Sequence, residues 1–133
     1  MYKVLLFGFI GILFAAAAVV HEAKKVNVIS IGYHADSCED CNTLKAKMKK
    51  MNMKFFSSPI VFIKYDKTNA ATQKKAEKEL TKWGMLEVAR RDDGLKYVIL
   101  YRADTKEKLE QINYDDDIEV MEGKIRQALS ATR

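Results

Sequence analysis

The chain has 133 residues, of which 48% are hydrophobic and 31% are charged, and it contains only two cysteines. This size and composition predict one globular domain, and a single possible internal disulfide excludes the small scaffolds that depend on several disulfides. The formal net charge of +5 arises from interspersed basic and acidic residues. Because no basic segment carries interleaved aromatic residues, the charge pattern predicts a solvated surface rather than a nucleic-acid-binding face.

An apolar segment opens the chain. Lys3 precedes an uninterrupted apolar run from Val4 to Val20, and the run ends in small residues, as in a secretory signal. It is longer than most signal cores and slightly shorter than a typical membrane span. We therefore expect residues 1–23 to be a signal peptide or an inner-membrane anchor. Residues 24–133 should then form a domain in the periplasm or another extracytoplasmic compartment.

The first half of this domain predicts a strand, a helix and a second strand. Val26–Tyr33 is rich in β-branched and aromatic residues, which favours a strand. From Cys38 to about Met53, apolar residues recur every three or four positions, which predicts an amphipathic helix. Ile60–Tyr65 is a nearly continuous apolar run opened by Pro59, which suits a strand buried on both faces.

The second half predicts a helix over Asn69–Trp83, a buried strand over Leu95–Arg102 and a short strand around Leu109–Ile112. Asp115–Asp117 would begin a final helix. The expected order is β-α-β-α-β-β-α. A helical crossover between the first two strands implies a parallel pair, and the short turn between the last two implies an antiparallel hairpin. The predicted fold is therefore α/β, a mixed sheet flanked by helices.

Cys38 and Cys41 stand two residues apart directly after the first predicted strand. This spacing lets one turn of helix bring both sulfurs together. If Cys38 lies at the helix start, unpaired backbone N–H groups and the helix dipole favour its thiolate. Because export favours disulfide chemistry, we interpret the pair as a redox centre. A static structural disulfide and a metal site are the alternatives, although a disulfide across so short a loop constrains the unfolded chain little.

Both residues between the cysteines, Glu39 and Asp40, are acidic. Negative charge beside Cys38 disfavours its thiolate and so opposes the helix terminus. A less stabilised thiolate makes the reduced form less favoured. The dithiol is therefore expected to act as a reductant or as a weak oxidant.

These features together resemble the thioredoxin family. The resemblance rests on the segment Ala-Asp-Ser-Cys-Glu-Asp-Cys at 35–41, on the strand ending Lys64-Tyr65-Asp66, and on the strand–turn–strand–helix end. It covers the chain after the leader and implies a thioredoxin-like domain. In that family the first cysteine, here Cys38, attacks a substrate disulfide, and the second, here Cys41, resolves the mixed disulfide. No organic cofactor is implied, since electrons pass through the cysteines themselves.

Three positions depart from the family's pattern. Ser37 stands where a tryptophan usually precedes the first cysteine, and Gly32 stands where many members have a buried acid that relays a proton. The family also places a cis-proline before the third core strand, facing the disulfide. The corresponding site, near Leu95 and Lys96, has no proline. The resemblance implies that Leu95 and Lys96 border the substrate-binding surface, with a different docking mode.

His34 and Asp36 lie just before the cysteine pair. His34 could shuttle a proton or join the thiols as a metal ligand. Two thiols and one imidazole leave a zinc site short of ligands, so we expect no metal and place His34 in a partly exposed loop. Asp36 is expected to be a loop or capping acid before the helix, with a base as the alternative role.

We therefore expect an exported, thioredoxin-like thiol–disulfide oxidoreductase. Its expected partners are proteins with disulfides and an upstream thiol–disulfide electron donor or acceptor, with no nucleic acid and with membrane contact only through the leader. Two competing interpretations are a binding or assembly module that kept the fold and lost turnover, and a dithiol protein that binds a metal.

Overall fold

The computed structural model describes residues 25–133, so the expected leader at 1–23 lies outside the described residues. The sheet has the strand order β2-β1-β3-β4. β1 pairs in parallel with β2 and antiparallel with β3, and β3 pairs antiparallel with β4, which confirms the predicted mixed sheet. The strands are β1 (Val28–His34), β2 (Ile60–Asp66), β3 (Tyr97–Arg102) and β4 (Lys108–Asn113).

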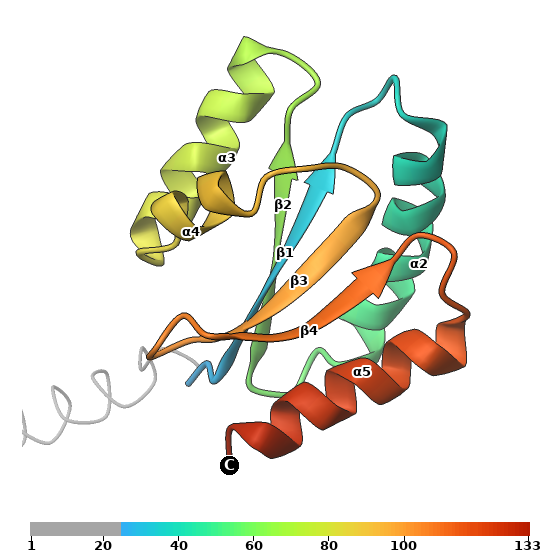
Figure 1. Cartoon of the computed structure of the whole chain (residues 1–133), viewed down its shortest axis with the longest axis vertical. Helices are drawn as coiled ribbons and strands as arrows, with labels where there is room; N and C mark the ends of the chain where they lie inside the picture. Colours follow the sequence, from blue (N-terminus) through green and yellow to red (C-terminus); the bar gives the residue numbers. More distant parts are fainter. Residues whose placement is uncertain (1–24) are drawn as a thin grey trace, which may run out of the picture.

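Helices cover both faces of this sheet (Figure 1). They are α2 (Glu39–Lys54), α3 (Ala70–Lys82), α4 (Leu86–Arg91) and α5 (Ile118–Ala131). α2 and α5 pack on one face and α3 and α4 on the other, so the sheet separates two hydrophobic clusters. Side chains alternate along a strand, and β1 accordingly places Val28 in one cluster and Ile29 and Ile31 in the other. The domain has a thioredoxin-like fold.

Asn69 and Gly84 determine where α3 begins and ends. Asn69 caps its start, because the Asn69 side chain accepts a hydrogen bond from the Thr72 N–H at 2.9 Å. Gly84 ends it in the left-handed region, with φ of 68°. The N–H groups of Gly84 and Met85 then return to carbonyls of the last turn, an arrangement that glycine favours. The chain reverses there and enters α4.

Three features differ from the sequence-based expectation. The short helix α4 was not predicted, because six residues are too few to establish a helical hydrophobic period. β3 begins at Tyr97 rather than Leu95, which leaves Leu95 and Lys96 in the preceding loop. β1 begins two residues later than predicted and continues through His34. This last difference brings His34 into the sheet, below the cysteine pair.

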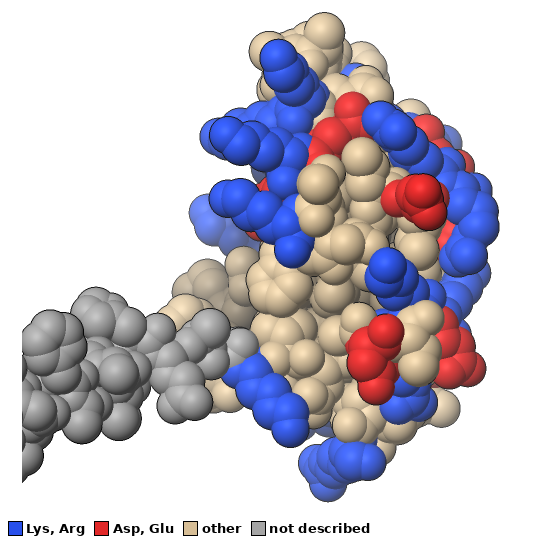
Figure 2. All heavy atoms as spheres, turned by 90° about the vertical axis from the view of Figure 1, so that its left-hand side faces the viewer, with Lys and Arg blue, Asp and Glu red and all other residues tan. Residues whose placement is uncertain are grey.

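The surface carries mixed charge. Figure 2, which views the molecule from the side of α3 and α4, shows lysine and arginine side chains with aspartate and glutamate between them. This distribution agrees with the interspersed charge of the sequence. Within residues 25–133, none of the helices is long and apolar enough to cross a membrane.

Candidate redox site

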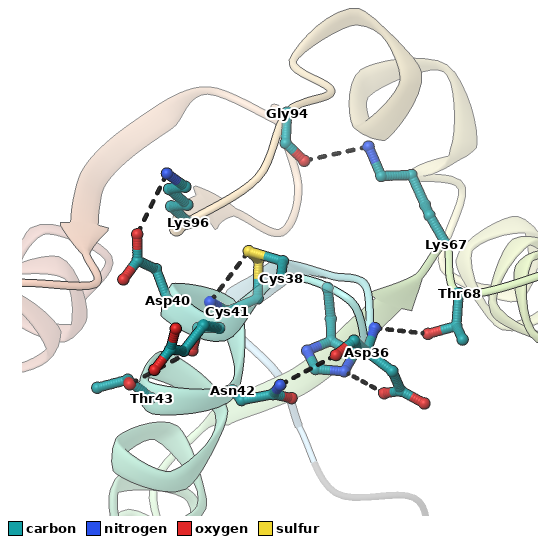
Figure 3. Close-up of a disulfide and its surroundings, with 12 residues drawn as sticks. Asp36, Cys38, Asp40, Cys41, Asn42, Thr43, Lys67, Thr68, Gly94 and Lys96 are labelled. Carbon is teal, nitrogen blue, oxygen red and sulfur yellow. Dashed lines mark hydrogen bonds and ion pairs between the residues drawn. A yellow bond between two sulfur atoms is a disulfide. The ribbon is translucent and has the colours of Figure 1, made fainter.

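Cys38 and Cys41 form a disulfide at the start of α2, with their Cα atoms 5.1 Å apart (Figure 3). Cys38 is the N-cap residue and has an extended backbone. Its Sγ accepts a hydrogen bond from the Cys41 N–H at 3.1 Å, while its carbonyl accepts one from the Asn42 N–H at 3.1 Å. An N–H that points at Cys38 Sγ also stabilises negative charge on that sulfur after reduction.

The two cysteines differ in exposure. Cys38 is partly exposed, whereas Cys41 is only 1% exposed. Cys38 is therefore the cysteine that another protein can approach, while Cys41 lies within the domain, bonded to Cys38 Sγ. A thioredoxin-like fold with a disulfide-forming pair at a helix start supports thiol–disulfide oxidoreductase chemistry in general.

The acidic insert is partly balanced by a cation. Glu39 is exposed, and Asp40 is half-buried in the first turn of α2. Lys96 lies beside the cysteine pair, on the side of Asp40, and its Nζ is 3.2 Å from the Asp40 carboxylate (Figure 3). The same Nζ lies 5.8 Å from the centre of the Tyr114 ring. The charge beside Cys38 is thus set by two acids and one lysine, and not by the acids alone.

The loop before β3 faces the disulfide (Figure 3). Lys67 Nζ donates a hydrogen bond to the Gly94 carbonyl at 3.1 Å, and the Tyr114 N–H donates one to the Lys96 carbonyl at 3.0 Å. These contacts hold the loop at both ends, and Leu95 between them is 38% exposed. No cis peptide bond occurs in residues 25–133, and Lys96 has a left-handed backbone with φ of 74°. The role of Leu95 and Lys96 in substrate binding stays a prediction.

His34 is not the partly exposed loop residue expected from sequence. It is the last residue of β1 and is only 2% exposed. Its Nε2 lies 2.7 Å from the Asp36 carboxylate. The expectation failed because pairing with β2, where His34 lies opposite Asp66, extends the strand beyond the point that residue preferences indicate. A signal was present, since Ser30, Gly32 and His34 alternate with apolar residues, a period of two that is typical of a strand and that continues through His34.

The sequence predicted that Asp36 is either a loop acid or the cap of the helix. It lies in the loop, and Cys38 caps α2. The Asp36 side chain is 66% exposed. Its backbone is fixed on both sides, because its N–H donates to Thr68 Oγ1 at 3.0 Å and its carbonyl accepts from the Asn42 amide at 3.1 Å. Ser37, which follows, is exposed. The loop thus presents Ser37 to solvent while it directs the Asp36 carboxylate toward His34.

Asp66 was missed by the sequence analysis. Burial raises the pKa of Asp66, but hydrogen bonds from Thr68 and the nearby cation of Lys64 outweigh burial, so the pKa is lowered overall. One polar atom each from His34, Asp36 and Asp66 lies within 4.8 Å of the others. The signal for this cluster is the parallel pairing of the first two strands, because the carboxyl ends of parallel strands meet at one edge of the sheet.

No protein-family model and no curated protein matches the sequence. Among solved structures, the chain is similar to the protein Trxlp from Edwardsiella tarda, with 17% identity, coverage of 80% of this chain and 89% of that chain, and a TM-score of 0.49. It is also similar to thioredoxin from Malassezia sympodialis, with 11% identity, coverage of 79% and 80%, and a TM-score of 0.49. A third similar structure is the germline-specific thioredoxin Deadhead from Drosophila melanogaster. It is 14% identical, with coverage of 84% of this chain and 89% of that chain and a TM-score of 0.47. The fold assignment rests on the strand order and helix placement described above.

Proposed function

We propose that this protein is an exported thiol–disulfide oxidoreductase that exchanges disulfides with protein substrates through Cys38 and Cys41. The observation that carries this proposal is the pairing of the partly exposed Cys38 with the buried Cys41 at the start of α2. A disulfide that served stability alone would not need a partly exposed partner. Helix-start placement also favours the thiolate that exchange requires.

The exchange proceeds in two displacements. The Cys38 thiolate attacks one sulfur of a client disulfide, forms a mixed disulfide and releases the other client sulfur as a thiolate. Cys41, once deprotonated, attacks Cys38 Sγ, which breaks the mixed disulfide and releases the second client thiolate. The client gains two electrons and takes up two protons, and the Cys38–Cys41 disulfide forms. The reverse sequence oxidises a client dithiol.

The charge around the pair supports a reductant or a weak oxidant. Glu39 and Asp40 disfavour the Cys38 thiolate, and Lys96 offsets only one of these two carboxylates. A thiolate that receives little net stabilisation leaves the disulfide comparatively stable. Equilibration with glutathione buffers measures this directly. A potential near about −270 mV would agree with the proposal, and one near about −120 mV would identify a strong oxidant instead.

Trapping of mixed disulfides tests the assigned roles. With Cys41→Ser, a client attached to Cys38 cannot be released, so disulfide-linked complexes should accumulate. The matched variant Cys38→Ser removes the accessible nucleophile and should trap nothing. Complexes are resolved on non-reducing gels and must disappear on reduction. Equal trapping by both variants, or by neither, would contradict the assignment.

Reduction of insulin disulfides separates turnover from binding. The intact dithiol should accelerate insulin reduction above the rate of free dithiol, and the double variant Cys38→Ser/Cys41→Ser should not. A binding or assembly module would bind partners without this acceleration. The export part of the proposal rests on the apolar run from Val4 to Val20. N-terminal sequencing and fractionation of cells producing the full chain test it, and a cytoplasmic, unprocessed product would refute it.

A further inference from the structure

A cavity of about 250 Å³ lies beneath the disulfide, between α2 and the sheet. It exists because the face of β1 that meets α2 carries the small residues Ser30 and Gly32. Gly32 adds no side chain to this space. The cavity is large enough for water, since one water occupies about 30 Å³. Its lining includes Cys41 from α2 and His34 from the end of β1.

The two ring nitrogens of His34 have different surroundings. Nε2 lies 2.7 Å from the Asp36 carboxylate, which can only accept a hydrogen bond. Nε2 must therefore carry the hydrogen of the neutral ring, and Nδ1 is the nitrogen with a free lone pair. Nδ1 is buried and has no hydrogen-bond partner among residues 25–133. A buried polar atom left unpaired is costly to the fold and calls for an explanation.

We propose that His34 transfers the proton of Cys41, with Asp36 as the residue that positions and polarises the imidazole. This inference rests on the proposed function and concerns its second displacement. In the mixed-disulfide state, the S–H bond of Cys41 breaks and the proton passes through a cavity water to Nδ1 of His34. The resulting Cys41 thiolate attacks Cys38 Sγ, and the client sulfur leaves with the electron pair of the broken bond. The imidazolium then releases its proton to solvent, and in the reverse direction His34 returns a proton to Cys41.

Charged groups of both signs surround His34. Asp36 on the preceding loop and Asp66 at the end of β2 each place a carboxylate oxygen within 4.8 Å of a His34 ring nitrogen. Lys64 from β2 and the α2 lysines Lys45 and Lys49 also line the cavity. β3 contributes only the apolar Val98 to the lining. Among residues 25–133, Asp36 is the one carboxylate hydrogen-bonded to the ring, which makes it the residue that orients the imidazole.

Reaction of the reduced protein with 5,5′-dithiobis(2-nitrobenzoate) separates the two displacements. Cys38 releases one nitrobenzoate thiolate as it forms a mixed disulfide, and Cys41 releases the second as it closes the Cys38–Cys41 disulfide. His34→Gln keeps an N–H donor for Asp36 but supplies no base. We expect its first phase to be unchanged and its second phase to be slower by roughly 100-fold at neutral pH, the lower end of what a positioned base contributes. The difference should close at alkaline pH, where hydroxide removes the proton, and a merely structural role would not produce that closure.

Asp36→Asn provides a second variant that does not endanger the fold, because the Asp36 side chain is largely exposed. It should slow the second phase by several-fold and leave the first unchanged. Asp104→Asn removes an equal charge from the exposed β3–β4 turn at the opposite end of the sheet and should change neither phase. An unchanged second phase in Asp36→Asn and in folded His34→Gln would overturn the inference. If the unsubstituted protein itself released no second nitrobenzoate thiolate, the proposed function would fail instead.

Discussion

The ion pair between Lys96 and Asp40 predicts how the reactivity of Cys38 responds to charge. The two side chains are 52% and 39% exposed, so solvent screens their fields and each should contribute at the lower end of what helix-terminal charges do. We take about 0.5 kcal/mol for one such charge, which changes the ratio of Cys38 thiolate to thiol by a factor of about two. Lys96→Met should halve that ratio, because it leaves both carboxylates uncompensated.

Three further variants test the direction of the electrostatic effect on the Cys38 thiolate. The double variant Lys96→Met/Asp40→Asn removes a cation and an anion together and should return the ratio to nearly its original value. Glu39→Gln should raise the ratio about two-fold, since no ion pair within residues 25–133 offsets that carboxylate. The Glu39→Gln/Asp40→Asn double variant should raise it further. These opposite directions cannot follow from a general loss of stability.

The assay is the pH dependence of iodoacetamide alkylation in a Cys41→Ser background, where Cys38 is the only thiol. Lys106→Met serves as the matched control, because Lys106 also has a left-handed backbone, with φ of 63°, but lies in the β3–β4 turn. It should leave the alkylation profile unchanged. If Lys96→Met raised the thiolate fraction, or if the double variant behaved like Lys96→Met alone, the electrostatic reasoning would be refuted.

Three predictions concern stability. Lys106→Gly should stabilise the fold by about 0.5–1 kcal/mol in urea unfolding, because glycine adopts a left-handed backbone without the cost that lysine incurs; a destabilised variant would show that the side chain matters more than the backbone. Hydrogen bonding to Arg91 is the main reason that the pKa of Asp92 is lowered, with a further bond from Tyr101, so the folded state favours the carboxylate. The stability that Asp92 contributes is fully present above the pKa of the unfolded state, near about 4, and is lost as the pH falls through the lower pKa of the folded state. Asp92→Asn should therefore make the free energy of unfolding less dependent on pH at acid pH. Leu80→Ala, at a fully buried site, should cost about 2–5 kcal/mol, whereas Val120→Ala, at a site 45% exposed, should cost under about 1 kcal/mol.

The strands and long helices could be predicted because hydrophobic periodicity determines them locally. α2 and α3 show apolar residues at helical spacing, and Pro59 marks the start of β2. The helix α4 could not be predicted in this way. Its position depends on tertiary contacts, such as the hydrogen bond of 2.8 Å from the Tyr33 hydroxyl to the Ala89 carbonyl. Six residues do not form a stable helix without such contacts.

In the candidate site, too, the features set by neighbouring residues could be predicted and those set by tertiary contacts could not. The Cys38–Cys41 pair and its acidic insert are adjacent in sequence, so their proximity follows from one turn of helix. Lys96 and Asp66 come from other elements, and only the sheet topology brings them beside α2 and His34. The environment of His34 combines both kinds of neighbour, with Asp36 from the adjacent loop and Asp66 from β2. That is why the sequence predicted the proximity of the two sulfurs but placed His34 in a partly exposed loop.

The first strand of the domain occupies the middle of its sheet, and this placement has a consequence for the order in which the molecule is built. β1 cannot be enclosed until β3 has been synthesised, since Ile31 lies between Ile63 and Ile99. Contacts between such distant segments form slowly, because a long stretch of chain must first be closed into a loop. The sulfurs of Cys38 and Cys41, by contrast, meet within a single helical turn. A nascent chain can therefore bring the two sulfurs together before its core is complete, so closing this disulfide does not require the long-range contacts of the sheet.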